Sequence, residues 1–534
     1  MSSSIVHRLN EDILLAVLSY LPGYDVVQLA RTCKFMYALS CPSFSVKISY
    51  WDQHQLSRRA EAICRPGSSS ASCLQDLELA LMSHSRDEDI KAVCDILRTT
   101  KNLRTLSLSI VIPPGGVGYP SIVHALTQMK DLRALRYSPI FLDGILPMIE
   151  HIPSPNLANL YLWYDVNWDP QFPPLLSVLR SFPKLVTLTL SNFVPQPTSL
   201  DATRTSLPSI RHIILENVSV AATDILYLCP NLDTIDLSPS YGWNFTQGHM
   251  EPQPRWPKVS RLTVAIQGRA RRWYRGVEAL DDAQLQTVFV ELLERRASAV
   301  SRLELAGEWE FTRDGVTAVD ADTLGRLARL LAALQPRVLT LLVHATGLQT
   351  PEKRLDGWMW TEVARALPCL RALTLRCAPR LSWVPPETLP AALAQLSLRC
   401  LFIDTSPVDD PKEPGSDRRE LERVKAFDAL PTKLVPALTE MRVLGFKGTA
   451  ALPADAFKNL KAEACLEELE EWRKDHGERN TRWWRVDGVG EERTLVELWR
   501  EYGEQAQKIV EDSEEDGIAE DLDAIYLDRC RYEP

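Results

Sequence analysis

The sequence predicts an α/β chain in three parts: a short all-α unit at the N-terminus, a curved solenoid of strand-and-helix repeats, and an acidic helical tail. Three observations predict this order: an apolar helical rhythm over Leu9–Met36, a recurring LxxLxL segment from about residue 70, and an excess of acidic residues after Lys461. We expect the three parts to span residues 1–50, 51–460 and 461–534, with insertions in the solenoid near 265–300 and 404–420.

The N-terminal part has the features of two or three short helices. Asn10 is a good N-cap, apolar residues follow at helical spacing, and Pro22-Gly23 ends the first helix before Asp25 caps the next. A unit this small cannot hold a stable core alone, because isolated folding usually fails below ~40 residues. Its apolar face must therefore be covered by the rest of the chain or by a partner.

The LxxLxL segments predict a stack of short parallel strands. Thirteen can be read, and the first seven spacings between them are 22 to 29 residues, as in leucine-rich repeats. Neighbouring units must stack to bury their leucines, which predicts a parallel sheet on the concave side and helices outside, as at Leu280–Arg296 and Thr323–Leu334. The segments are Leu74-Leu77-Leu79, Leu103-Leu106-Leu108, Leu132-Leu135-Tyr137, Leu157-Leu160-Leu162, Leu185-Leu188-Leu190, Ile210-Ile213-Leu215, Leu232-Ile235-Leu237, Val259-Leu262-Val264, Val300-Leu303-Leu305, Val338-Leu341-Val343, Leu370-Leu373-Leu375, Leu393-Leu396-Leu398 and Leu438-Met441-Val443.

The repeats depart from the regular pattern in several places, and the solenoid is therefore expected to be irregular. The asparagine that usually follows the last leucine is mostly absent, and Asn192 and Asn217 lie one residue early. Asp404–Arg419 is rich in proline and polar residues, which predicts a loop inside the array. The charged segment after about Ala462 predicts a helical polar cap for the solenoid, with recruitment of another protein as the alternative.

Composition and charge exclude several classes of protein. Hydrophobic residues make up 45% of the 534 residues and charged residues 24%, as in ordinary globular proteins. The net charge is −10, but residues 461–534 hold 23 acidic and 11 basic residues, so the rest is close to neutral, which argues against a nucleic-acid-binding protein. The sequence contains no apolar run of ~18 residues, so we expect no membrane span.

The cysteine pattern and the lack of catalytic motifs predict an intracellular protein that is not an enzyme. The 11 cysteines form no CxxC pair, and the N-terminus has no signal-peptide pattern, which favours the cytoplasm or nucleus. The sequence contains no phosphate-binding loop, HExxH or GxSxG motif, and no clustered cysteine and histidine spacing. We expect no catalytic residue, metal or cofactor.

The opening stretch carries a family pattern. Leu9-Asn10-Glu11-Asp12-Ile13-Leu14, Leu21-Pro22 and Cys33-Lys34 stand at the spacing of an F-box domain, which this stretch resembles. Asn10 replaces the usual proline, and Met36 occupies the place of the usual aromatic residue. The resemblance implies binding to the Skp-family adaptor through ten residues: Leu9, Ile13, Leu14, Val17, Leu18, Leu21, Pro22, Val26, Leu29 and Cys33. The alternative is a helical cap on the solenoid.

The resemblance also implies a function for the whole chain. An F-box protein with a repeat array would be the substrate-recognition subunit of an SCF-type cullin–RING ubiquitin ligase, and the repeat face would bind a target protein. The alternative is a scaffold that binds partners without ligase activity.

Candidate target-binding residues lie at strand positions that alternate with the leucines. Exposed aromatic residues are typical interface anchors, although any one of these could instead pack against a neighbouring loop. Aligned arginines would suit a phosphorylated segment. The candidates are Tyr161, Trp163, Arg302, Arg376, Arg399 and Arg442, and the basic cluster 268–276 (GRARRWYRG) could contact acidic protein, phosphate or RNA, or be an ordinary solvated loop.

Overall fold

A computed structural model gives the fold. It describes residues 13–14, 17–18, 23–33, 35–36, 45–48, 53–65, 71, 74–81, 87–110, 119–140, 149, 152–164, 172–193, 206–218, 220–239, 255–266, 290–307, 321–343, 357–377, 389–404, 416–448, 481–488, 490–513 and 522. The chain divides into two units: Met1–Leu232 with Asn244–His249, and Asp233–Trp243 with Met250–Pro534.

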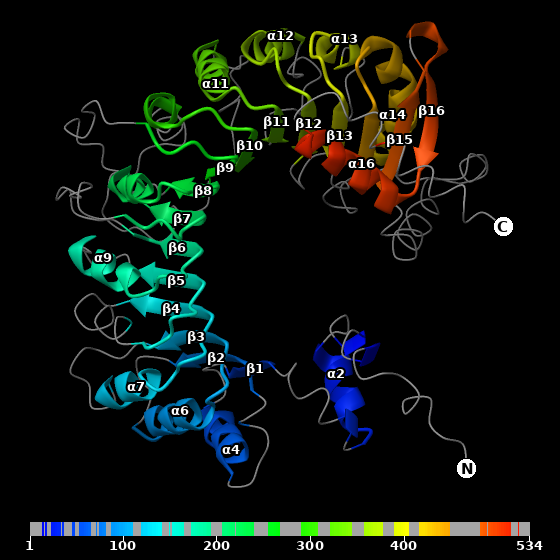
Figure 1. Cartoon of the computed structure of the whole chain (residues 1–534). Coiled ribbons are helices and arrows are strands. Elements are labelled where there is room, and N and C mark those ends of the chain that lie inside the picture. Colours follow the sequence, from blue (N-terminus) through cyan, green and yellow to red (C-terminus); the bar gives the residue numbers. More distant parts are fainter. Residues whose placement is uncertain are drawn as a thin grey trace, which may run out of the picture. The chain divides into compact units, whose positions relative to one another are not determined.

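The first unit begins with helical residues of the N-terminal part, among them α2 (Gly23–Ala30), and continues as a parallel sheet (Figure 1). Strands β1 to β7 pair in chain order, each parallel to the next. The strands are β1 (Ser45–Ile48), β2 (Asp76–Leu81), β3 (Thr105–Ile110), β4 (Ala134–Ile140), β5 (Asn159–Tyr164), β6 (Thr187–Ser191) and β7 (His212–Val218). The helices between them are α4 (Gln53–Cys64), α6 (Asp87–Thr99), α7 (Tyr119–Leu126), α9 (Phe172–Arg180) and the 3₁₀ helix η4 (Val220–Leu228).

The core of the first unit lies between strands and helices. In β5, buried Leu160, Leu162 and Tyr164 alternate with residues that are more exposed, because side chains of a strand point to opposite faces in turn. Leu160 aligns with Leu135 on one side and Leu188 on the other, so each repeat covers the leucines of its neighbour. Burying one leucine contributes roughly 1.5–3 kcal/mol, and the contribution recurs in every repeat. The alternate positions form the second side of the sheet, named here the inner face.

An asparagine ladder supports the ends of the middle strands. Asn192 and Asn217 both have positive φ, which lets the chain turn away from β6 and β7. The amide of Asn192 donates to the carbonyl of Tyr164 at 3.1 Å, and the amide of Asn217 donates to Asn192. The two asparagines that stand one residue early thus carry out the supporting role of the repeat asparagine.

The second unit repeats the strand-and-helix arrangement. Strands β8 to β14 pair in chain order and in parallel. They are β8 (Thr234–Pro239), β9 (Arg261–Ile266), β10 (Arg302–Gly307), β11 (Val338–Val343), β12 (Ala372–Cys377), β13 (Cys400–Asp404) and β14 (Val443–Lys447). The helices α11 (Ala321–Leu334), α12 (Gly357–Ala366), α13 (Leu389–Leu393) and α14 (Ser416–Ala437) pack successively against one another along the outside (Figure 1).

The fold class predicted from the leucine pattern is confirmed, and strands β2 to β14 correspond to the thirteen segments. Three segments were assigned in the wrong frame. Leu339 and Leu341 align with Leu303 and Leu305, so Val338 lies on the inner face. In the same way, Leu401 and Ile403 are the core residues of β13, and Leu444 and Phe446 are those of β14. Runs such as LAQLSLRCLFI offer two overlapping LxxLxL frames, and only pairing with the preceding strand selects one.

The tail differs from the helical prediction. β15 (Thr481–Asp487) pairs antiparallel with β14, and β16 (Thr494–Leu498) pairs antiparallel with β15. Trp483, Trp484 and Val486 are buried, and such aromatic and β-branched residues favour a strand over a charged helix. Helix α16 (Arg500–Asp512) follows β16. The array therefore ends in a β-hairpin and a helix.

Other predicted segments are partly described. The helix predicted at Thr323–Leu334 lies within α11. Of the helix predicted at Leu280–Arg296, residues 290–296 are helical and the remainder lies outside the described residues. The loop predicted at Asp404–Arg419 is corrected at both ends, since Asp404 belongs to β13 and α14 begins at Ser416. The basic cluster 268–276 lies outside the described residues.

Candidate functional site

The N-terminal part presents apolar side chains to solvent. Ile13 is 51% exposed and Val17 47% exposed, whereas Leu14 and Leu18 are buried. Residues four apart lie on one face of a helix, so Ile13 and Val17 form one stripe and Leu14 and Leu18 form the next. Phe35, at the end of the unit, is also exposed. Two exposed aliphatic residues on adjacent turns are a surface that a partner can cover.

The ten predicted adaptor residues therefore fall into three groups: buried, at least partly exposed, and without a described side chain. The prediction that Leu14 and Leu18 face a partner is corrected, because both are buried within this chain. Ile13 and Val17 are exposed, Cys33 is exposed, and Leu29 is half-buried. Val26 lies in α2, while Leu9, Leu21 and Pro22 lie outside the described residues.

The inner face of the second unit is covered by the chain's own helix α16. Val338, Ala372, Cys400 and Val443 occupy one row across β11 to β14, and all four are buried in a cluster with Ala506 and Val510 of α16. Figure 1 shows α16 on the side of these strands away from α11 to α13. This region of the sheet is thus not an open surface for a target.

Two glycines allow this helix to approach. Trp483 of β15 stacks on Phe402, with ring centroids 4.9 Å apart and an interplanar angle of 13°. A Cβ atom at Gly503 of α16, or at Gly445 of β14, would overlap the Trp483 ring. Both positions therefore require glycine for the indole to lie between strand and helix.

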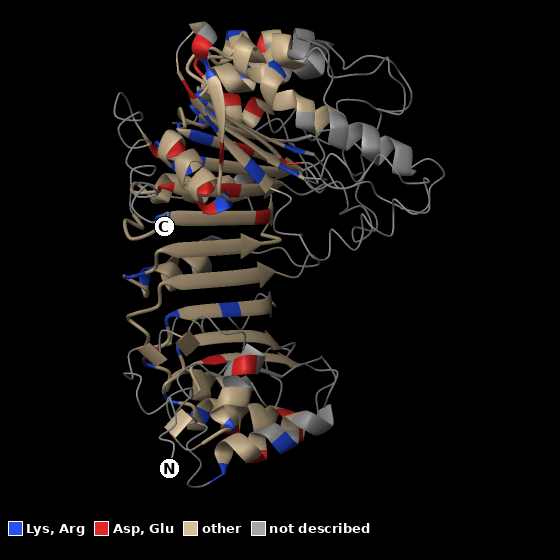
Figure 2. Ribbon diagram, turned by 90° about the vertical axis from the view of Figure 1, so that its right-hand side faces the viewer, with Lys and Arg blue, Asp and Glu red and all other residues tan. Residues whose placement is uncertain are grey.

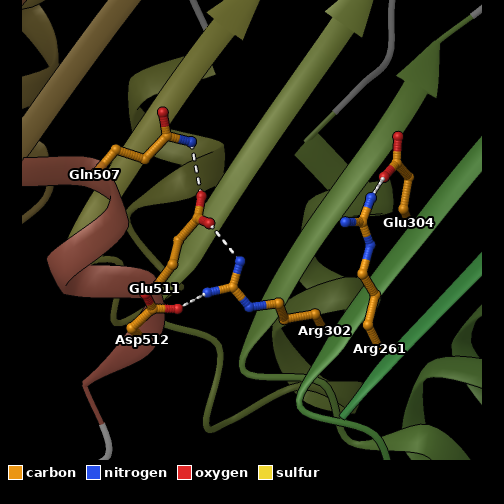
Figure 3. A network of polar contacts seen from close by, with 6 residues as sticks. All are labelled: Arg261, Arg302, Glu304, Gln507, Glu511 and Asp512. Carbon is orange, nitrogen blue, oxygen red and sulfur yellow. Dashed lines mark hydrogen bonds and ion pairs between the residues drawn. The ribbon is translucent and has the colours of Figure 1, made fainter. Parts of the chain in front are cut away.

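The C-terminal end of α16 is held by Arg302 (Figure 3). Arg302 pairs with Glu511 at 2.9 Å and also with Asp512. Gln507 donates to the other oxygen of Glu511 at 2.7 Å. Burial nevertheless raises the pKa of Glu511 above its usual range, against the opposing effects of Gln507 and Arg302. Arg302, predicted to bind a target, is instead engaged with the tail.

The remaining predicted arginines do not form one aligned row. Arg376 aligns with Asp404 and Lys447 near the ends of their strands, and its guanidinium pairs with Glu304 at 2.7 Å. Arg399 and Arg442 precede β13 and β14, where the amide of Arg442 donates to the carbonyl of Arg399. The expectation of an aligned set is wrong because it depended on the frame assigned to these repeats.

A cavity of about 500 Å³ remains between α16 and the strands of the second unit. Its charged lining residues are largely paired with one another. Arg261 pairs with Glu304 at 2.8 Å, and Lys447 pairs with Asp404 at 3.1 Å (Figure 3 shows the first pair). Mutual pairing leaves little charge to attract a ligand.

The inner face of the first unit differs in exposure and charge. Tyr161 and Trp163, predicted to be exposed on a strand, lie on this face of β5 and are half-buried. Figure 2 colours the charged residues, and neither β5 (NLYLWY) nor β6 (TLTLS) contains one. Glu216 of β7 lies two strands from Trp163, with Ser191 between them in register.

Tyr161 links three strands of this face. The guanidinium of Arg136 lies 4.3 Å from the centre of the Tyr161 ring, a cation–π contact. The Tyr161 hydroxyl donates to Glu216 at 3.5 Å, across β6. Burial, and then the charge of Glu216, raise the pKa of Tyr161 above its usual range, so the phenol stays protonated at neutral pH. Across β5 to β7 the inner face is therefore aromatic, with Glu216 as its carboxylate.

The described residues contain no cluster of three or more His, Cys, Asp or Glu that could hold a metal ion. None of the helices in the described ranges is long and apolar enough to cross a membrane.

Among solved structures, the chain is similar to an internalin from Listeria monocytogenes, at 12% identity and a TM-score of 0.28, over 74% of this chain and 90% of the internalin. No curated protein matches the chain. The F-box domain family matches residues 6–42. With the strand register of the repeats, this match shows that the chain combines an F-box domain with a leucine-rich-repeat-like array.

Proposed function

We propose that this protein is the substrate-recognition subunit of an SCF-type ubiquitin ligase. F-box domains act in general in substrate recognition by these ligases and bind Skp-family adaptors. The observation that carries the proposal is the F-box match at residues 6–42, in which Ile13 and Val17 are exposed. Two exposed aliphatic side chains within the matched domain support the proposed contact.

The adaptor contact is proposed to centre on Ile13 and Val17. Leu29 and Cys33, on or just after α2, are further candidates, since neither is buried. Leu14 and Leu18 would then support the domain from within. The adaptor would connect the chain to the cullin–RING assembly inside the cell, in the cytoplasm or the nucleus.

The target is proposed to bind the inner face of the first unit. The half-exposed aromatic residues Tyr161 and Trp163 support this choice, and α16 already occupies much of the corresponding face in the second unit. The chain itself would make and break no bonds. It would accelerate ubiquitin transfer by holding a target lysine close to the charged enzyme, because proximity converts an encounter into a local reaction.

The test is co-purification of the full chain with a Skp-family adaptor and its cullin. An Ile13→Asp/Val17→Asp variant is expected to lose at least ten-fold in adaptor recovery, because two charges would enter an apolar contact. Val496→Asp, which changes a 40% exposed valine in β16, is the matched control and should bind like wild type.

The co-purification experiment distinguishes the ligase function from the scaffold function and tests the adaptor contact. Equal adaptor recovery by the double variant would refute the proposed contact. Adaptor binding without cullin or ubiquitinated targets would favour the scaffold function.

A further inference from the structure

We propose that the inner face of β5 to β7 recognises a basic side chain, lysine or arginine, of the target, held between Trp163 and Glu216. The inference rests on the proposed function, because it specifies the chemistry of the segment bound there. It follows from the arrangement of four residues, named here the aromatic–acid site: Tyr161, Trp163, Ser191 and Glu216.

The register fixes the spacing of this site. Trp163 aligns with Ser191, and Ser191 aligns with Glu216. Adjacent strands lie ~4.8 Å apart, so the backbones of Trp163 and Glu216 are separated by about 10 Å. Ser191 between them is small and buried. The Tyr161 side chain reaches over this small residue toward Glu216. A ligand's aliphatic stem would therefore lie above Ser191, beside the indole, with its charged end at the carboxylate.

Glu216 lacks a cationic partner within the described part of the chain. Its hydrogen bond comes from the neutral Tyr161 hydroxyl and is long, at 3.5 Å. Arg136 is directed to the Tyr161 ring instead, and β5 and β6 contribute no charge. Glu216 is half-buried, so a paired cation would interact in a partly desolvated place, where charge-assisted hydrogen bonds are strongest.

The aromatic residues add a second attraction for a cation. A lysine or arginine over a tryptophan or tyrosine ring gains about 0.5–1 kcal/mol at exposed sites and more when desolvated. The Arg136–Tyr161 contact shows that this face already holds one guanidinium in that way. A carboxylate beside an aromatic ring selects a basic residue over a neutral or acidic one.

In the second unit the acids of the inner face already have cationic partners within the chain, unlike Glu216 among the described residues. There the inner-face acids are paired: Glu304 with two arginines, and Asp404 with Lys447. Among the residues that the structure describes, Glu216 has no such pairing, so its charge is available to a partner.

The experiment selects ligands from a phage library of random 12-residue peptides displayed against the full chain. Wild type is expected to enrich lysine or arginine at one fixed position. Glu216→Gln and Trp163→Ala should each weaken the best peptide at least ten-fold, and Glu216→Arg should select acidic peptides instead. Glu440→Gln removes an exposed acid elsewhere and should leave binding unchanged.

Three outcomes would overturn the inference: no enriched peptide, enrichment without a basic residue, or binding by Glu216→Gln within two-fold of wild type. Thermal unfolding of each variant confirms that it remains folded. Adaptor binding is measured separately. Loss of adaptor binding with intact selection of basic peptides would refute the proposed ligase role and leave this site standing.

Discussion

At the scale of single residues, the contact between Trp483 and Gly503 decides whether α16 can lie on the sheet. Glycine inside a helix is ordinarily unfavourable by about 1 kcal/mol relative to alanine. Gly503 is nevertheless placed in α16, because any Cβ there would overlap the indole. The cost to the helix is offset by burial of a large aromatic side chain.

Replacing Gly503 by alanine should therefore destabilise the chain. We expect a loss of about 1–3 kcal/mol, as for other overpacked cores, measured by urea unfolding of the second unit. Gly325→Ala is the matched control, because no atom lies within 4 Å of the position of its Cβ in α11. That change should be neutral or stabilising, by up to about 1 kcal/mol. Equal stability of Gly503→Ala and wild type would show that the helix does not depend on this contact.

The residue scale also shows a limit of sequence reasoning. Arg302 and Arg376 could be identified as inner-face residues from the LxxLxL pattern, but their partners could not. Glu511 lies 209 residues from Arg302 in the sequence, and only the folded chain brings the two together. By contrast, Tyr161 and Trp163 stand at strand positions that the leucine spacing specifies directly.

At the scale of elements, two kinds of contact hold α16 on the sheet. Apolar residues of the inner face pack against Ala506 and Val510, and Glu511 pairs with Arg302 although burial disfavours its charged form. The pKa of Glu511 is raised in the docked helix, so the docked state binds a proton more readily than the undocked state. This contribution to docking is complete below the undocked pKa. It is lost as the pH rises through the docked pKa of Glu511.

Docking of α16 should consequently weaken as the pH rises through the raised pKa of Glu511, and Glu511→Gln should remove this dependence. Hydrogen exchange of residues 500–512, compared between variant and wild type at each pH, measures the effect. Glu501→Gln changes an exposed acid of the same helix and serves as control. Parallel protection profiles of wild type and Glu511→Gln would contradict the expectation.

Elements also differ in how far the sequence reveals them. Leucine spacing was sufficient for β2 to β10, where each segment offers one frame. It failed at β11, β13 and β14, because neighbouring apolar residues allow a second frame that only strand pairing excludes. β15 and β16 contain no LxxLxL segment. The charged residues around Trp483 and Trp484 favoured a helix, so these strands were not predicted.

At the scale of the whole molecule, two surfaces of different chemistry lie on separate parts of the chain. The F-box surface offers Ile13 and Val17, which are aliphatic, and the aromatic–acid site offers rings and one carboxylate. The F-box was readable from its motif, and the repeat array from its period. The position of the proposed target face was not, because the sequence does not show that α16 packs on the inner face of the second unit.

These surfaces should be separable by mutation, since they share no residue and no hydrogen bond among the described residues. Ile13→Asp/Val17→Asp should lose adaptor recovery while selected basic peptides bind within two-fold of wild type. Glu216→Gln should show the reverse pattern. Reciprocal loss, with either variant impairing both partners ten-fold, would mean that the two sites are energetically coupled, because coupling between binding sites acts equally in both directions. Measuring both affinities on both variants therefore decides between independent surfaces and a linked pair.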